Sequence, residues 1–311
     1  MAHSVKCTSV SVIAPVILVA LACLCTFPRA SLAQMPSATI LGVVTDSSSA
    51  VIPGATVSVR NLETGQSRSI TTDTNGRYRL AQLPVGLYEV RTEQAGFRSE
   101  VRTGVALSVA QEAVLDFTLG VGGIEQTVTV SAEAPLVNTT SGALGGLVDE
   151  KKVAELPLNG RNYISLTLLQ PGVSEHRSKS QGNETIGTWF SSNGAPVRSN
   201  SYLLDGAPMQ SYGGSNTASM SGGTLGIEGI REYRVITSGF GAEYGMTMGS
   251  QMMIVSKGGT NSFHGSVFEY LRNDNLDARN FFDLKTERTP GRLPEFKRNN
   301  FGASLGRVNT K

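Results

Sequence analysis

Residues 257–274 read KGGTNSFHGSVFEYLRND. A polar, turn-rich cluster is followed by an aromatic stretch and then by charged residues. A short aromatic run that follows Gly, Asn and Ser residues is typical of a β-strand. Such a strand could belong to a small soluble domain or could be the first strand of a larger sheet. The rest of the chain decides between these alternatives.

A second run, residues 296–306, reads FKRNNFGASLG and alternates large apolar residues with small or polar ones. This alternation is typical of transmembrane β-strands, which face lipid on one side and the lumen on the other. The earlier run alternates poorly, because Phe268 and Tyr270 share a face while Glu269 falls between two apolar residues. Aromatic residues at a membrane interface would account for this.

The 48 residues from His264 to the C-terminus leave room for two spanning strands of about 9–11 residues each. Two strands cannot close a barrel, because each unpaired backbone group in hydrocarbon costs several kcal/mol. We therefore expect this chain to be a fragment of a longer protein.

The N-terminus differs in character from the rest of the chain. Residues 10–27 form an uncharged apolar run after a short positive region, and small residues then precede Gln34. This order predicts a secretory signal peptide that is cleaved between Ala33 and Gln34. A membrane anchor is the alternative, but Pro15 and a run shorter than about 20 residues disfavour it.

Cleavage would remove all three cysteines, which lie at positions 7, 23 and 25. The mature chain could then hold no disulfide and no thiolate metal site. Loss of Lys6 and Arg29 lowers the net charge from +2 to 0. Since no Lys/Arg stripe or nucleic-acid motif is present, we exclude nucleic acid as a partner. A lipoprotein signal at Cys23 is disfavoured, because Ala20 stands where leucine is usual.

Residues 38–119 have a period close to two, in short runs that are bounded by Gly, Pro, Asn or Asp. About seven such runs predict an antiparallel β-sandwich of immunoglobulin-like type. Tyr78 and Leu80 alternate with arginines, so one face of this strand should be buried and the other exposed to solvent. The runs are ATILGVVTD, PGATVSVRN, QSRSITTD, GRYRLAQL, GLYEVRTE, FRSEVRT and AVLDFTL.

Landmarks along this segment resemble the carboxypeptidase regulatory-like domain, a transthyretin- or carbohydrate-binding-like β-sandwich. The resemblance implies a non-catalytic accessory module, and the name of the fold suggests carbohydrate as a ligand. The stretch Asp73–Gly76 lacks the further acids of a Ca²⁺ loop, so we expect a plain turn there. The landmarks are Gly42, Asp46, Pro53-Gly54-Ala55, Thr72-Asp73, Asn75-Gly76, Tyr78, Leu83-Pro84, Gly86, Tyr88 and Ala95-Gly96-Phe97.

A flexible GVGG joint at residues 120–123 leads into the β-prone stretch EQTVTVSA at residues 125–132. This stretch could be the last strand of the sandwich or a strand of the next domain. It could also be a segment left free to add to the sheet edge of another protein. It resembles the TonB box, which implies contact with a TonB-type periplasmic energy-coupling protein. The implied contact residues are Thr127, Val128, Thr129, Val130, Ser131 and Ala132.

The next part of the chain resembles the plug domain of TonB-dependent receptors, in the Oar-like branch. Within this part of the chain, residues 202–204 are predicted to form a strand that runs into a turn, and residues 232–236 a second strand. ARNFF at residues 278–282 and FKRNNFGASLG continue the resemblance into the barrel. Met246, Met248, Met252 and Met253 depart from the family pattern; we expect this cluster to fill an irregular core, with a soft ligand surface as the alternative. The plug landmarks are LPLNGRN (156–162), LLQPGV (168–173), Asn193-Gly194 with Arg198, LDG (204–206), IEGIREYRV (227–235), AEYG (242–245) and SKGGTNSFHGS (256–266).

Nothing in the sequence indicates an enzyme, a metal site or a cofactor. His176 and His264 are far apart and lack metal-ligand spacing, and no nucleophile elbow, HExxH or phosphate loop is present. Asp205 and Glu228 could form a pair of carboxylates. We expect Asp205 instead to bond to the backbone amides of its own turn.

The predicted fold is mainly β. It comprises a signal peptide (1–33), the regulatory-like β-sandwich (34–120), the TonB-box segment with an α+β plug domain (121–262), and the start of an incomplete outer-membrane β-barrel (263–311). The resemblance implies the N-terminal part of a TonB-dependent receptor in the outer membrane of a diderm bacterium, with plug and sandwich on the periplasmic and lumen side. Such a receptor binds a solute and takes it up with supplied energy. The alternatives are a structural or adhesive envelope protein whose sandwich binds a carbohydrate or surface polymer, and a soluble secreted sandwich protein.

Overall fold

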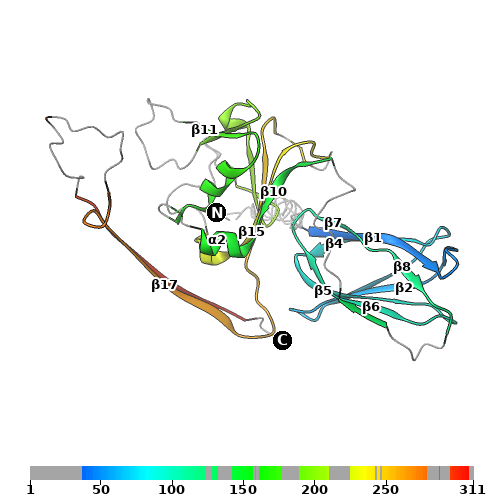
Figure 1. Cartoon of the computed structure of the whole chain (residues 1–311). Helices are drawn as coiled ribbons and strands as arrows, with labels where there is room; N and C mark the ends of the chain where they lie inside the picture. Colours follow the sequence, from blue (N-terminus) through cyan, green and yellow to red (C-terminus); the bar gives the residue numbers. More distant parts are fainter. Residues whose placement is uncertain are drawn as a thin grey trace, which may run out of the picture. The chain divides into compact units, whose positions relative to one another are not determined.

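The computed structural model describes residues 37–122, 128–131, 142–156, 158, 161–176, 189–209, 225–241, 244–245, 247–278, 287 and 295–307. The predicted signal peptide, with its cleavage site between Ala33 and Gln34, lies outside these residues. Strands dominate the described part of the chain (Figure 1). No helix in that part is long and apolar enough to cross a membrane.

The N-terminal strands form two sheets around one core, as expected of a sandwich. One sheet has the order β4-β1-β7, with β8 also pairing to β1, and the other has the order β3-β2-β5-β6-β9. Three pairings are parallel, namely β1 with β7, β1 with β8, and β6 with β9. The strands are β1 (Ser37–Asp46), β2 (Thr56–Asn61), β3 (Ser67–Thr71), β4 (Arg77–Pro84), β5 (Gly86–Glu93), β6 (Glu100–Leu107), β7 (Glu112–Val114), β8 (Phe117–Leu119) and β9 (Val128–Ser131).

The alternating pattern of the sequence decides which side chains enter the sandwich core. Tyr78 and Leu80 are buried, whereas Arg77 and Arg79 are exposed, because successive strand residues point to opposite faces. The Tyr78 hydroxyl donates to the Leu115 carbonyl at 2.6 Å. The buried Tyr78 hydroxyl therefore has a hydrogen-bond partner.

The turn at Asp73 is a plain one, as predicted. One Asp73 carboxylate oxygen accepts hydrogen bonds from the backbone N–H groups of Asn75 and Arg77, both at 2.8 Å. Gly76 has a φ of 68°, which glycine adopts without strain. The carboxylate thus closes the turn between β3 and β4.

The second core surrounds a mixed sheet of order β10-β15-β16-β13-β14, in which only β13 and β16 pair in parallel. The predicted strands at 202–204 and 232–236 are confirmed as parts of β13 and β15. The sheet is made of β10 (Leu144–Val148), β13 (Ser201–Leu204), β14 (Ala207–Pro208), β15 (Ile230–Ser238) and β16 (Gln251–Ser256), and a separate pair of β11 (Val173–Glu175) and β12 (Phe190–Ser192).

Short helices accompany the mixed sheet. In helix α2 (Glu150–Glu155) the side chain of the N-cap residue Asp149 accepts from the Lys152 N–H, which satisfies one unpaired donor of the first turn. The 3₁₀ helices are η2 (Tyr163–Leu169), η4 (Val197–Ser199) and η5 (Ile227–Gly229).

Aromatic and sulfur-containing side chains fill the second core. The rings of Tyr163 and Tyr233 lie 5.7 Å apart, and the Tyr233 hydroxyl donates to the Tyr163 carbonyl. Met252 and Met253 are buried on β16, which confirms the prediction that this pair fills the core. The same prediction is wrong for Met248, whose side chain is 80 % exposed. Met246 lies outside the described residues.

A long hairpin of β17 (His264–Asn273) and β18 (Lys297–Gly306) ends the described chain (Figure 1). The two strands pair antiparallel over ten residue pairs, from His264↔Gly306 to Asn273↔Lys297. One face carries large apolar side chains that are 66–86 % exposed, namely Val267, Leu271, Phe301 and Leu305. The predicted alternation of the second run is therefore present in β18.

Candidate functional site

The segment that resembles a TonB box is a strand at a sheet edge. Residues Val128–Ser131 form β9, which pairs in parallel with β6 from Glu100↔Val128 to Thr103↔Ser131. The other two predicted contact residues, Thr127 and Ala132, lie outside the described residues. The structure thus places the segment where the last strand of the sandwich was expected, and no partner is needed to hold it extended.

The far edge of β9 pairs with no other described strand, because β9 ends the sheet. A strand in this position has a row of backbone N–H and C=O groups that can pair with an additional strand. Recognition through backbone groups is the mode known as strand addition. The geometry therefore suits binding to an extended segment of another protein.

Arg161, part of the LPLNGRN landmark, connects several elements, a role that the sequence did not predict. Its guanidinium forms a partly buried ion pair with Glu228 and lies 4.2 Å from the ring centres of both Phe268 and Tyr270. Arginine stacks favourably on aromatic faces while its edge bonds a carboxylate. One side chain thus links the loop after α2, η5 and the hairpin.

This contact explains the poor alternation of β17. Phe268 and Tyr270 occupy the face of the hairpin that meets Arg161, opposite the exposed apolar face. Two aromatic residues separated by one position on that face were the sequence signal for a cationic partner. The membrane-interface position suggested for this pair stays a prediction.

A cavity of about 620 Å³ lies next to Arg161. Apolar side chains of α2 and η5 line one side, and polar or aromatic side chains of the hairpin line the other. Most cations at its border have acidic partners, such as Arg272 with Asp277 at 3.2 Å. The lining includes Val153, Leu156, Leu158, Ile227, Tyr270 and Arg298.

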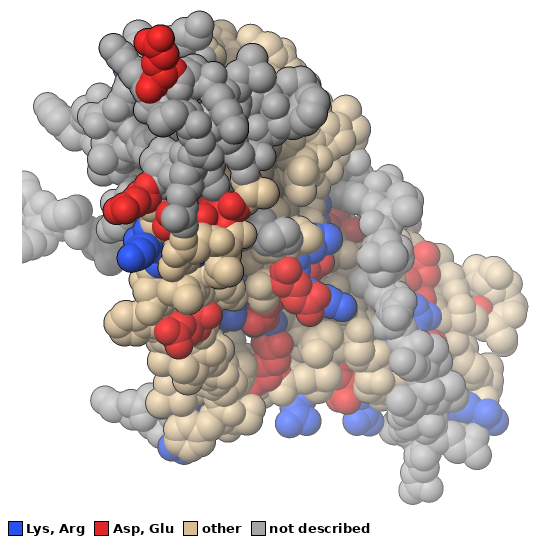
Figure 2. Space-filling model, turned by 60° about the vertical axis from the view of Figure 1, so that its left-hand side comes forward, with Lys and Arg blue, Asp and Glu red and all other residues tan. Residues whose placement is uncertain are grey.

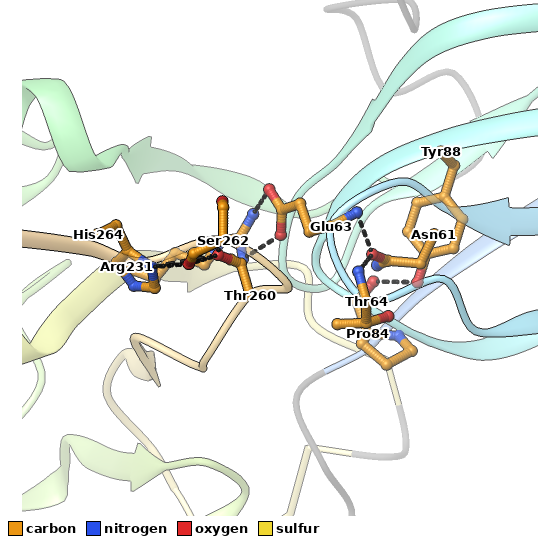
Figure 3. A network of polar contacts seen from close by, with 9 residues as sticks. All are labelled: Asn61, Glu63, Thr64, Pro84, Tyr88, Arg231, Thr260, Ser262 and His264. Atoms are coloured by element: carbon orange, nitrogen blue, oxygen red, sulfur yellow. Dashed lines mark hydrogen bonds and ion pairs between the residues drawn. The ribbon is translucent and has the colours of Figure 1, made fainter. Parts of the chain in front are cut away.

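A polar network connects the turn after β2 to β15 (Figure 3). The Glu63 carboxylate accepts two hydrogen bonds from the Arg231 guanidinium, each at 2.7 Å. Asn61 holds this turn, because its side-chain oxygen accepts from the N–H groups of Glu63 and Thr64. The Glu63 carbonyl also accepts from the N–H of Asn261, in the segment that leads to β17.

The contact with Glu63 changes the pKa of Arg231. Hydrogen bonding of the Arg231 guanidinium to the Glu63 carboxylate raises the pKa of Arg231 above its ordinary value, because it stabilises the charged guanidinium. Two parallel N–H···O bonds of this kind are stronger and more directional than a single one. They hold the turn that contains Glu63 against β15.

A buried carboxylate lies one residue further along β15. Glu232 accepts a hydrogen bond from the backbone N–H of Val109. Burial raises the pKa of Glu232, and the Val109 bond and the charges of Arg231 and Arg234 offset this only in part. Next to Val109, buried apolar side chains of several strands pack together. This cluster consists of Val85, Val109, Ile236, Met253 and Val255.

The proposed pair of carboxylates, Asp205 and Glu228, is not formed. Glu228 pairs with Arg161. Asp205 accepts from the N–H and the hydroxyl of Ser256, at 2.9 and 2.7 Å. The prediction that Asp205 bonds to its own turn is therefore wrong, because the parallel pairing of β13 with β16 brings Ser256 to the turn.

The two histidines considered as metal ligands make hydrogen bonds to the backbone or to neighbouring side chains. The His176 N–H donates to the Trp189 carbonyl, and the His264 ring lies 3.1 Å from the Thr260 hydroxyl. No group of three metal-ligating side chains occurs among the described residues. On the face shown in Figure 2, acidic and basic side chains are interspersed and form no large area of one sign.

Two protein families match parts of the chain. Residues 39–120 match the "Carboxypeptidase regulatory-like domain", and residues 255–307 match the "Outer membrane beta barrel domain". The "TonB-dependent transporter Oar" of Myxococcus xanthus is 30 % identical over 250 residues, which are 76 % of this chain and 22 % of that protein. The chain thus spans less than a quarter of the length of this relative.

Solved structures resemble smaller parts of the chain. The TIE protein of Bacillus anthracis is 22 % identical, over 28 % of this chain and 17 % of its own, with a TM-score of 0.24. A "putative carbohydrate binding protein" of Bacteroides uniformis is 23 % identical, over 27 % of this chain and 41 % of its own, with a TM-score of 0.24. At these scores neither likeness carries an argument about function.

Proposed function

We propose, from the relationship of this chain to the TonB-dependent receptors of outer membranes, that it is the N-terminal part of a receptor that binds a solute and takes it up with energy from a periplasmic TonB-type protein. The relative over three quarters of the chain is a transporter rather than an enzyme, in line with the prediction that this protein is not an enzyme. The observation that carries the proposal is the position of β9. Val128–Ser131, four of the six residues that resemble a TonB box, form an edge strand, and strand addition requires such an edge.

The mixed sheet is the plug in this proposal, and β17 and β18 are the first strands of the barrel wall. In support, the Arg161 contact joins the loop after α2 to the polar face of the hairpin. The proposed parts are a signal peptide (1–33), the sandwich (34–120), the coupling segment with the plug (121–262), and the start of the barrel (263–311).

The proposed orientation follows from the two faces of the hairpin. The exposed apolar face would meet outer-membrane lipid, since outward-facing residues of barrel strands are apolar. The face with Phe268 and Tyr270 would meet the plug in the lumen. The sandwich and the plug would then lie on the periplasmic and lumen side.

A capture experiment tests the coupling role. The chain is presented in detergent to the purified C-terminal domain of a TonB-type protein, with and without residues 125–132. We expect the deletion to abolish capture, because it removes β9, the strand with which the strand of the TonB-type protein would pair. Capture that survives the deletion would contradict the proposal and favour the adhesive envelope protein.

Two substitutions at one position serve as matched controls. Val130→Pro removes a backbone N–H that a sheet requires, whereas Val130→Ala leaves the backbone intact. We expect capture to fall with proline and to persist with alanine. Equal loss in both variants would indicate recognition of the side chain and not of the strand.

A further inference from the structure

We infer that the sandwich acts as a template for the coupling segment: β6 holds β9 extended, and the partner strand adds to the outer edge of β9 without displacing it from β6. This inference rests on the proposed function and adds the surface at which the partner docks. The docking surface is then a composite sheet edge that the sandwich supports. Its partner is an exposed strand of the energy-coupling protein.

The strand that supports β9 is held by the rest of the sandwich. On its other side β6 pairs with β5 from Gly86↔Leu107 to Thr92↔Glu100. Arg102 on β6 donates to Glu100 at 2.9 Å and lies 4.4 Å from the centre of the Phe117 ring. These contacts do not involve β9, so the template is ordered independently of the segment that it holds.

Within the described residues, the outer edge of β9 lacks the features that protect sheet edges from pairing. Natural edge strands use charged side chains, proline or bulges to prevent association. At the opposite end of the same sheet, β3 carries Arg68, whose guanidinium donates to the carbonyls of Ala81 and Gln82. The sequence of β9, Val-Thr-Val-Ser, contains neither a charge nor a proline. An edge strand with three β-branched residues and without a charge or a proline suits a site of strand addition.

Pre-ordering favours addition over displacement. A free segment must lose backbone conformational entropy when it becomes a strand. The pairing from Glu100↔Val128 to Thr103↔Ser131 means that β9 has already lost this entropy. Displacement would also break the hydrogen bonds to β6, whereas addition at the outer edge keeps them. A binding surface that is ordered beforehand gains affinity for this reason.

A reversible cross-link between β6 and β9 tests the inference. Thr103 and Ser131 are register partners, and neighbouring strands lie about 4.8 Å apart, within the range that a disulfide spans. All native cysteines precede residue 34, so Thr103→Cys with Ser131→Cys supplies the only thiols of the chain from residue 34 onward. Oxidised glutathione closes the bond and dithiothreitol opens it. Failure of the bond to form, checked by mass spectrometry, would contradict the pairing itself.

Affinity for the purified C-terminal domain of a TonB-type protein is then measured in both redox states. We expect the oxidised chain to bind as tightly as the reduced chain or more tightly. A loss of about tenfold or more on oxidation that dithiothreitol reverses would overturn the inference and would show that β9 must leave β6. The single variants Thr103→Cys and Ser131→Cys, treated alike, control for effects of each substitution.

The same experiment separates the inference from the proposed function. If neither the native chain nor the reduced variant binds the domain, the coupling role fails, and the template role fails with it. If the reduced variant binds and the oxidised one does not, the coupling role stands and only the template role fails. Binding in both states supports both.

Discussion

Glu232 shows how one buried charge makes stability depend on pH. Burial raises its pKa above the ordinary 4.5, so the folded chain keeps a proton that the unfolded chain releases. The contribution of Glu232 to stability should therefore be greatest below pH 4.5 and should fall as the pH rises through the raised pKa. The Val109 hydrogen bond limits this cost but does not remove it.

Glu232→Gln tests this account, because glutamine can still accept from the Val109 N–H and carries no charge. We expect the variant to be more stable than the native chain above the raised pKa, by about 1.4 kcal/mol per unit of the shift. Below pH 4.5 the two chains should be equally stable. Thermal unfolding of the chain in detergent between about pH 4 and pH 8 measures the difference.

Glu155→Gln provides the control, since Glu155 is an exposed acid at the end of α2. It should leave the pH profile unchanged. A native chain that gains stability relative to Glu232→Gln as the pH rises would contradict the assigned direction.

The hairpin depends on a contact that its own two strands do not supply. A two-stranded hairpin alone is marginally stable in water, and Arg161 joins it to the loop after α2 and to η5. The residue itself has a φ of 56°, a conformation that non-glycine residues rarely adopt. Such strain persists only where surrounding contacts offset it.

Arg161→Ala should destabilise the attachment of the hairpin by about 2 kcal/mol, because it leaves the Glu228 carboxylate unpaired and removes the stacking on Phe268 and Tyr270. Hydrogen exchange of the β17 amides in detergent measures the effect. Arg161→Lys should recover only part of it, since an ammonium group pairs with the carboxylate but lacks the planar stacking surface. Unchanged exchange in Arg161→Ala would contradict the role of this contact.

The polar network in Figure 3 joins parts of the chain that are far apart in sequence. Glu63 and Arg231 are separated by 168 residues. The Glu63 turn also contacts Asn261, just before the hairpin. The turn after β2 thus contacts both β15 and the segment that leads to β17. The ion pair of Glu63 with Arg231 should therefore make the stability of this turn depend on that of β15.

A double-mutant cycle with Glu63→Gln and Arg231→Gln measures this coupling. We expect an interaction energy of about 1–3 kcal/mol in urea denaturation, because the pair is two-pronged and about three-quarters buried. The exposed pair of Arg79 and Glu112 serves as a control and should couple by less than about 1 kcal/mol. Additive effects of the two changes at Glu63 and Arg231 would show that the contact does not join the two regions.

Patterns within short stretches of sequence predicted much of the fold. The period of two in residues 38–119 predicted the sandwich and the buried positions of Tyr78 and Leu80. The strands at 202–204 and 232–236 were predicted from short apolar runs, and the core position of Met252 and Met253 from the way methionine fills irregular cores. Each of these depends on residues within a few positions of one another, because a strand repeats its environment every second residue.

Long-range partners were not predicted. The ion pair of Arg161 with Glu228, the bond from Asp205 to Ser256 and the parallel pairing of β9 with β6 each join residues more than 20 positions apart. No periodicity encodes such a pairing. It follows from the order of strands in the sheets, which depends on how whole elements pack.

The amino-acid order alone therefore determined the mainly-β class, the faces of the strands and the family resemblance that points to an outer-membrane receptor. Folding in three dimensions decided that Val128–Ser131, within the stretch that resembles a TonB box, pair with β6, and that Arg161 joins the loop after α2 to the hairpin. The physical reason is that burial patterns act over neighbouring residues, whereas hydrogen bonds and ion pairs form between whichever groups the packed sheets bring within about 3 Å.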